Sequence, residues 1–206
     1  MLIPFDFWPV GGNHGFDSPY IRLPYVELSY RSVETDYVIS NIEETVMEVD
    51  FTPLEVDSDI SLWHTWYGAF SRAANSSFRL ITKSSDVHQT LSATTGGVTG
   101  YTVMQSTPFG DRLLVKQGGN FIIINDEYQA LGAEIARPAN PIDVFRLNGY
   151  YETRNSENTI YSGGAARFYS IKCMERGIMK LDMVPVRRSD DGQEGFWCMI
   201  HNKFYY

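Results

Sequence analysis

Hydrophobic and polar residues alternate along much of the chain with the period of two that is typical of half-buried β-strands. In residues 45–51 the side chains of one face would be Thr45, Met47, Val49 and Phe51. Similar short segments, separated by turn-forming residues, occur at 61–70, 78–82, 112–116, 121–125, 142–147, 167–174 and 178–186. About a dozen strands with regular turn spacing and no long amphipathic helix predict an all-β fold, an antiparallel β-sandwich.

The central part of the chain holds the strongest local signal. Residues 112–116 and 121–125 are joined by the polar, glycine-rich segment 117–120, which predicts a β-hairpin. Residues 126–136 are the helix candidate and would end before Pro138, but a loop with one helical turn fits this segment equally well.

The first 24 residues differ from the rest of the chain. Prolines and paired glycines exclude a regular helix or central strand there, at Pro4, Pro9, Gly11, Gly12, Pro19 and Pro24. The segment nevertheless carries aromatic side chains that a free linker would not, namely Phe5, Phe7, Trp8, Phe16 and Tyr20. We therefore expect a docking arm over residues 1–24, packed on its own sandwich or on a neighbouring subunit, and one sandwich domain over residues 25–206.

Composition and charge narrow the function classes. A chain of 206 residues fits one β-sandwich domain. Its 17 Lys and Arg against 25 Asp and Glu give a net charge of −8, which argues against broad contact with nucleic acid or anionic membrane. The N-terminal residues lack the regions of an export signal, and no apolar run approaches the roughly 20 residues of a membrane span. We expect neither standard export nor a membrane anchor.

The two cysteines do not form a disulfide framework. Cys173 and Cys198 fall in segments that we expect to be neighbouring strands, so a bridge between them is geometrically conceivable. Two buried free thiols are the favoured interpretation.

The C-terminal fifth of the chain supplies the most specific pattern. Residues 166–173 and 182–192 are two strand segments with a Ser-Asp-Asp-Gly turn, and residues 195–205 begin Gly-Phe-Trp and end in aromatic residues. This block resembles the closing strands of concanavalin A-like, laminin G-like β-sandwich (jelly-roll) domains. Upstream segments similar to that family are 37–39, 47–51, 67–69, 111–119, 121–126 and 141–146. One departure is Cys198, where the family commonly has an acidic residue.

The resemblance implies binding more often than catalysis. Hydrolases of this kind place three acidic residues at alternating positions of one strand, where two can flank a glycosidic bond. Here Glu48 and Asp50 share a face, but the next positions on it are Thr52 and Leu54. With the third carboxylate missing, we expect a solvated strand face and no enzyme activity.

Metal and sugar ligation are the remaining chemistries. The histidines and cysteines show no zinc spacing, whereas Asp57 and Asp59 could supply oxygen ligands to calcium, with a solvated acidic loop as the alternative.

Sugars stack on aromatic rings, and the candidate glycan-binding residues are His64, Trp66, Tyr150 and Tyr151. The resemblance places Tyr67 in the core, so His64 and Trp66 would face outward. We expect Tyr150 and Tyr151 in a loop, and core packing is the alternative for each aromatic residue.

Domains of this family are frequent in surface proteins of gut Bacteroidetes and in virion proteins of their phages. The sequence therefore predicts a non-enzymatic bacteriophage virion component, decorating the capsid or tail, joined to other subunits through its arm and touching host surface polysaccharide. A glycan-binding module of a bacterial surface protein is the alternative, and a glycoside hydrolase is the least favoured. We expect an oligomer or larger assembly and no cofactor beyond calcium.

Overall fold

The computed structural model describes residues 19–40, 44–54, 59–66, 77–84, 88–94, 101–108, 110–118, 121–130, 144–154, 157–162 and 164–206. These residues are all-β and form strands in antiparallel sheets, with no helix among them. The expected all-β class is therefore confirmed.

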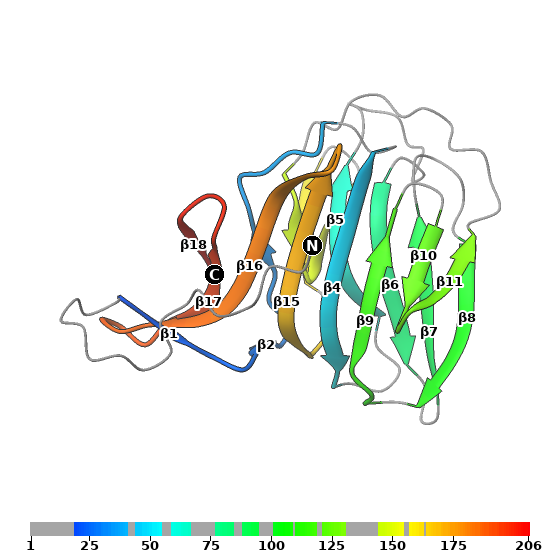
Figure 1. The fold of residues 1–206 in the computed structure, drawn as a ribbon, viewed down its shortest axis with the longest axis horizontal. Helices are drawn as coiled ribbons and strands as arrows, with labels where there is room; N and C mark the ends of the chain where they lie inside the picture. Colours follow the sequence, from blue (N-terminus) through cyan, green and yellow to red (C-terminus); the bar gives the residue numbers. More distant parts are fainter. Residues whose placement is uncertain are drawn as a thin grey trace.

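The strands of the described residues form three sheets (Figure 1). The ten-stranded sheet runs in the order β11 (Glu127–Ala130), β10 (Phe121–Ile124), β9 (Leu113–Gln117), β4 (Thr45–Pro53), β15 (Ala166–Glu175), β16 (Ile178–Arg188), β17 (Glu194–Cys198) and β18 (Lys203–Tyr205). It also includes β1 (Tyr20–Arg22) and β2 (Val26–Leu28). The six-stranded sheet runs β3 (Val33–Glu34), β12 (Arg146–Leu147), β5 (Asp59–Trp66), β6 (Ser77–Ser84), β7 (His88–Thr94) and β8 (Tyr101–Pro108). The third sheet pairs β13 (Gly149–Arg154) with β14 (Glu157–Ser162).

Local sequence signals account for the centre of the larger sheet. In β4 the predicted inward positions are all buried, namely Thr45, Met47, Val49 and Phe51. The predicted hairpin is confirmed, since β9 and β10 pair antiparallel with Ile122 opposite Gln117.

The helix candidate is wrong where the structure describes it. Asn125 and Asp126 both have left-handed backbone, with φ of 48° and 70°, and they join β10 to β11 as a two-residue turn. Asn and Asp tolerate this conformation, which suits tight hairpins. The Asn125 side chain also accepts a hydrogen bond from the Leu114 amide at 2.9 Å. The turn at Asn125 and Asp126 is therefore followed by strand β11 and not by a helix. Residues 131–136 of the helix candidate lie outside the described part of the chain.

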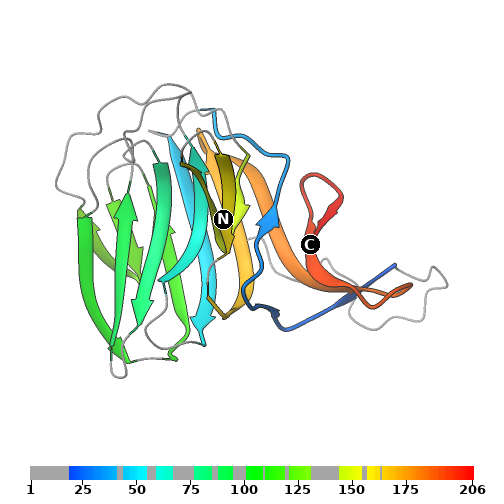
Figure 2. The same cartoon turned by 180° about the vertical axis from the view of Figure 1, so that it is seen from behind.

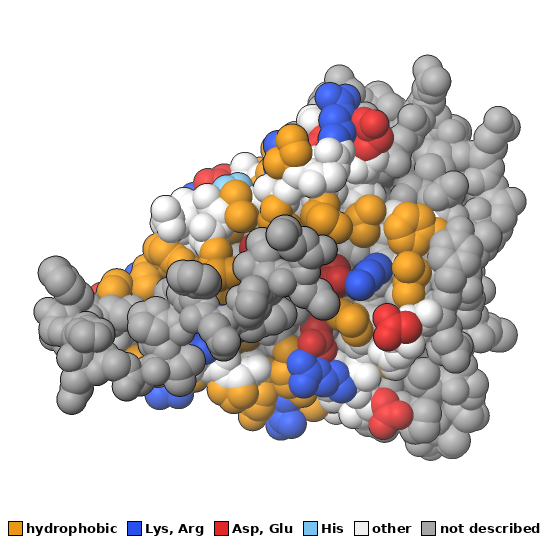
Figure 3. All heavy atoms as spheres, in the orientation of Figure 1, with side chains coloured by type: hydrophobic (Ala, Val, Ile, Leu, Met, Phe, Trp, Pro, Cys, Tyr) orange, Lys and Arg blue, Asp and Glu red, His pale blue; other side chains and the backbone are white. Residues whose placement is uncertain are grey.

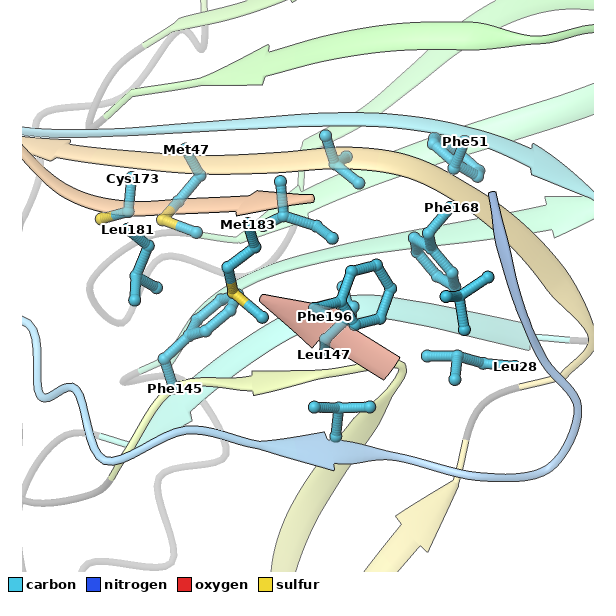
Figure 4. Packing of buried hydrophobic residues seen from close by; sticks show 14 of the residues in the cluster. Leu28, Met47, Phe51, Phe145, Leu147, Phe168, Cys173, Leu181, Met183 and Phe196 are labelled. Carbon is cyan, nitrogen blue, oxygen red and sulfur yellow. The ribbon is translucent and has the colours of Figure 1, made fainter. Parts of the chain in front are cut away.

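The hydrophobic core of the described residues is one cluster to which both large sheets contribute (Figure 4). The same buried cluster includes residues of the ten-stranded sheet together with Val33 of β3, Leu147 of β12 and Phe145, which immediately precedes β12. Figure 4 shows Met183 reaching toward the Phe145 ring from the opposite strand layer. The Phe51 and Phe168 rings stack with their centroids 6.2 Å apart. The further members from the larger sheet include Val26, Leu28, Met47, Val49, Leu113, Val115, Ile171, Cys173, Leu181, Phe196 and Cys198.

Strands β15 and β16 pair over only part of their length. The paired residues run from Glu175 opposite Ile178 to Ile171 opposite Met183. Beyond Ile171 and Met183 the two strands separate. The N-terminal segment fills both edges that open, because β2 pairs with residues 166–168 of β15 and β1 pairs with residues 186–188 of β16. Figure 2 shows this blue segment passing between the body of the molecule and the protruding strands. We call residues 184–188 of β16, with β1, β17 and β18, the extension.

The cysteines are free and buried, which confirms the favoured interpretation. Their strands are not neighbours, however, because Cys173 lies opposite Leu181 and Cys198 opposite Met183, on either side of β16. Two strand spacings amount to about 9–10 Å, beyond the Cα separation that a disulfide spans. Burial also raises the pKa of the Cys173 thiol to about 12, so it stays protonated at neutral pH.

The core predicts the effect of truncating a central ring. Phe168 is fully buried, and Phe168→Ala should lower the free energy of unfolding by about 3–5 kcal/mol in urea denaturation, because it leaves a cavity. Ile178→Ala is the control, since Ile178 is 60% exposed and should change stability by at most about 0.5 kcal/mol. Equal effects of both variants would contradict this description of the core.

Candidate functional site

The first pair of predicted glycan-binding residues lies in an interior strand. β5 is flanked by β12 and β6, with His64 opposite Arg146 on one side and Arg79 on the other. Trp66 ends the strand opposite Ser77. The side chains of β5 are outside the described part of the chain, so His64 and Trp66 as sugar ligands stay a prediction.

The second pair lies in a strand instead of the expected loop. Tyr150 and Tyr151 belong to β13 and pair with Tyr161 and Ile160 of β14. Asn148, immediately before this strand, has a left-handed φ of 53°. The tyrosine side chains are likewise not described.

The predicted calcium ligands are only partly placed. Asp57 lies outside the described residues, and Asp59 is the first residue of β5, where its backbone pairs with Lys83. Within the described ranges, no group of three His, Cys, Asp or Glu side chains could hold a metal ion.

The arm is described from Pro19 onward, so Phe5, Phe7, Trp8 and Phe16 lie outside the described residues. Tyr20 lies in the extension, where its ring is 4.5 Å from that of Trp197 and 5.6 Å from that of Phe204, centroid to centroid. The Ser189 amide donates a hydrogen bond to the Pro19 carbonyl at 2.8 Å. The last residues of the arm are thus bound to the chain's own C-terminal strands, through both backbone and aromatic contacts.

The Glu48 and Asp50 carboxylates form ion pairs. Glu48 contacts Lys116 at 3.2 Å and Lys172 at 3.1 Å, and Asp50 contacts Arg112 at 2.6 Å. The Asp50 hydrogen bond raises the pKa of Arg112, whose guanidinium also lies 3.8 Å from the Tyr169 ring centroid. Figure 3 shows such acidic and basic side chains side by side on this face. Both carboxylates of the predicted strand face are therefore engaged in ion pairs.

A polar network ties the C-terminal strand to the loop after β3. Lys203 donates to Asp36 at 2.6 Å, and the Tyr205 hydroxyl donates to the other oxygen of the same carboxylate. The His201 Nδ1 lies 2.9 Å from the Tyr205 hydroxyl. The hydrogen bonds from Lys203 and Tyr205 lower the pKa of Asp36 to about 2.

A second network holds the same loop to the end of β15. The buried Glu175 carboxylate accepts hydrogen bonds from the Tyr37 hydroxyl at 2.5 Å and from the Ser40 hydroxyl. Burial raises the pKa of Tyr37, so its hydroxyl remains a donor. Both networks are structural ties between segments that are far apart in sequence.

Sequence reasoning missed a shallow polar depression, which has a volume of about 470 Å³. It is formed where the segment after β2 meets the turn between β16 and β17, and its lining residues are Glu27, Ser29, Arg31, Asp191, Gly192, Gln193 and Glu194. We call this the 27–31/191–194 depression. The Ser-Asp-Asp-Gly turn was recognisable in the sequence, but nothing there indicated that residues 27–31 lie against it.

Comparisons with known proteins add no relative. The chain matches no protein-family model and no curated protein. The resemblance to laminin G-like domains therefore rests on the residues of this chain alone. In the ranges that the structure describes, no helix is long and apolar enough to cross a membrane.

The Asp36 network predicts a pH-dependent contribution to stability. Asp36→Asn should lower the free energy of unfolding at pH 7 by about 1 kcal/mol or less, because the carboxylate is 54% exposed and solvent screens its charge. The folded-state pKa of about 2 lies below the ordinary 3.8, so this contribution is present above pH 3.8 and is lost as the pH falls through 2. Urea denaturation of wild type and Asp36→Asn from pH 7 to pH 2 measures whether their free energies of unfolding converge as the pH falls.

Glu44→Gln is the matched control, because Glu44 is equally exposed and forms its ion pair with Arg176. It should change stability less than Asp36→Asn at pH 7. A difference between wild type and Asp36→Asn that stayed constant down to pH 2 would contradict the network's role.

Proposed function

We propose that the chain is a non-enzymatic structural component of a bacteriophage virion. In this proposal the two large sheets form a concanavalin A-like, laminin G-like β-sandwich, and the arm attaches the chain to other virion subunits. The observation that carries the proposal is the anchoring of the arm's last residues in the extension. A segment fastened at one end to a stable sheet can transmit force from a partner to the fold.

The extension is suited to this task. β1 pairs with β16 at Tyr20–Arg188, Ile21–Arg187 and Arg22–Val186, and the Leu23 amide donates to the Pro185 carbonyl at 3.0 Å. The three paired residues of β1 lie between Pro19 and Pro24. Because proline has no amide hydrogen to donate to a strand ladder, the flanking prolines keep β1 short. The described arm residues thus use the free edge of β16 instead of leaving it exposed to unrelated chains.

The arrangement of carboxylates supports the absence of catalysis in this proposal. The two acidic residues that a hydrolase would need, Glu48 and Asp50, are bound by Lys116, Lys172 and Arg112. Buried Glu175 is held by hydroxyl groups. These contacts give each of the three carboxylates a structural partner.

Deleting the arm tests the proposal. A variant that lacks residues 1–18 keeps β1 and should unfold at the same temperature as the full chain, but it should not be incorporated into particles when expressed alongside the phage that encodes it. Thermal unfolding by circular dichroism and immunoblotting of purified particles are the two measurements. Unaltered incorporation would overturn the arm's role.

A longer deletion is the matched comparison. Removing residues 1–24 also removes β1, and with it the contacts of the Tyr20 ring with Trp197 and Phe204. This variant should therefore unfold at a lower temperature than the full chain. The pair of deletions therefore separates loss of a partner contact from loss of the chain's own stability.

A glycan-binding module of a bacterial surface protein is the second candidate function. The 27–31/191–194 depression favours it, because hydroxyl, amide and carboxylate groups converge there within reach of a small polar ligand. The predicted aromatic ligands in β5 and β13 belong to the same hypothesis.

A glycan array with the full-length protein, run with calcium and again with a chelator, tests this candidate. If Trp66 and Tyr150 are sugar ligands, Trp66→Ala or Tyr150→Ala should weaken binding of an array hit by about 1–3 kcal/mol, because truncating an aromatic contact residue costs that much. Tyr206→Ala is the control, since Tyr206 is 61% exposed at the chain end. Unchanged affinity in both test variants would exclude these residues as ligands.

A further inference from the structure

The 27–31/191–194 depression lies at the junction of two chain segments that are distant in sequence. Ser29 and Arg31 come from the segment after β2, Asp191 and Gln193 come from the turn between β16 and β17, and Glu194 is the first residue of β17. The Arg31 guanidinium reaches across to the Glu194 carbonyl at 3.5 Å, a long and weak contact. The two walls are therefore close but are not closed onto each other.

The carboxylates of this depression are neutralised from outside it. Glu27 pairs with Arg167 at 3.3 Å, Glu194 with Arg187 at 3.3 Å, and Asp191 with Arg188. These three arginines do not line the depression.

Arg31 is the cation that remains. Within the part of the chain that the structure describes, it forms no ion pair, and its side chain makes only the contact with the Glu194 carbonyl. The three carboxylates each have an arginine partner, although Arg188 is shared between Asp190 and Asp191, so Arg31 is the charged lining residue whose side chain has no ion pair among the described residues. A guanidinium in this situation retains most of its donors for a ligand.

The backbone at Arg31 is held from the interior of the protein. The Asn148 side chain is fully buried and donates hydrogen bonds to the Arg31 carbonyl and to the Gly164 carbonyl, both at 3.1 Å. A residue fastened in this way needs little reordering when a ligand binds, which favours affinity.

An exposed aromatic ring accompanies this cation. Tyr30 precedes Arg31, is 68% exposed, and has a left-handed φ of 50°. Tyrosine rarely adopts this backbone, and such conformations persist only where surrounding contacts hold them. Its chain neighbours Ser29 and Arg31 both line the depression, so the Tyr30 backbone passes beside it, although Tyr30 itself is not a lining residue.

We propose that the 27–31/191–194 depression binds a carboxylated saccharide, such as a uronic acid unit of an acidic polysaccharide. Arg31 would bind the sugar carboxylate, since guanidinium and carboxylate form paired, charge-assisted hydrogen bonds. Tyr30 offers an apolar ring face to the sugar C–H groups, and Ser29 and Gln193 offer polar groups to its hydroxyls. This inference rests on the glycan contact in the proposed function and names its ligand class.

Among the described residues that line the depression, Arg31 is the cation, so a ligand would be recognised here through a single carboxylate. A neutral sugar would leave the guanidinium without its ion pair.

Calorimetry with the full-length protein tests the proposal, using hexagalacturonate and its methyl ester as probes. The acid should bind, and the ester should bind at least about tenfold more weakly, because esterification removes the charge that Arg31 recognises. Arg31→Gln should weaken binding of the acid by about tenfold or more. Arg176→Gln is the matched control, since Arg176 is exposed at the opposite end of β15, and it should bind like wild type.

Several outcomes would overturn the ligand class. These are equal affinity for acid and ester, no effect of Arg31→Gln, or equal competition by a short peptide with a free C-terminal carboxylate. If Arg31→Gln unfolds at a lower temperature than wild type, Gln193→Ala and Tyr30→Ala replace it, and each should weaken binding of the acid at least threefold.

The assembly role is measured separately. Arg31→Gln should enter particles like the full chain, in contrast to the deletion of residues 1–18. Loss of acid binding with normal incorporation supports both proposals. Normal incorporation by a wild-type protein that binds neither probe would overturn this inference and leave the assembly role standing.

Discussion

The separation of β15 from β16 is the constraint on which the rest of the structure depends. The two longest strands of the larger sheet pair near their shared hairpin and then diverge. Each would otherwise expose a row of unpaired backbone groups, which costs free energy when buried and invites wrong pairing when exposed. The segment from Tyr20 to Leu28 resolves this by pairing with β16 first and β15 second.

That insertion gives the N-terminal residues two roles. Val26 and Leu28 of β2 are fully buried and contribute to the core beside Phe168, so the segment belongs to the fold. Tyr20, at its other end, joins the aromatic contacts of Trp197 and Phe204. A single stretch of chain thus connects the core to the extension, and this connection is why we assign the preceding residues to attachment.

The same geometry creates the depression that we propose as a sugar site. Because β2 lies beside β15 while β16 turns away, the residues after β2 meet the turn that follows β16. Arg167 of β15, and Arg187 and Arg188 of β16, are then placed to neutralise the acidic residues of the rim. The attachment and binding proposals therefore draw on one structural event, although different residues carry them.

Local patterns in the sequence determined the strands themselves. Alternation set the buried face of β4, the polar glycine-rich segment joined β9 to β10, and Ser189 to Gly192 formed the expected turn, with Gly192 at a φ of 73°. Only the tertiary structure decided that β16 separates Cys173 from Cys198, and that Arg31 lies against Glu194. Strand periodicity and turn chemistry act between near neighbours and can be read from the sequence, whereas strand order depends on which distant edges pair, because a β-ladder uses the same backbone groups whatever the side chains.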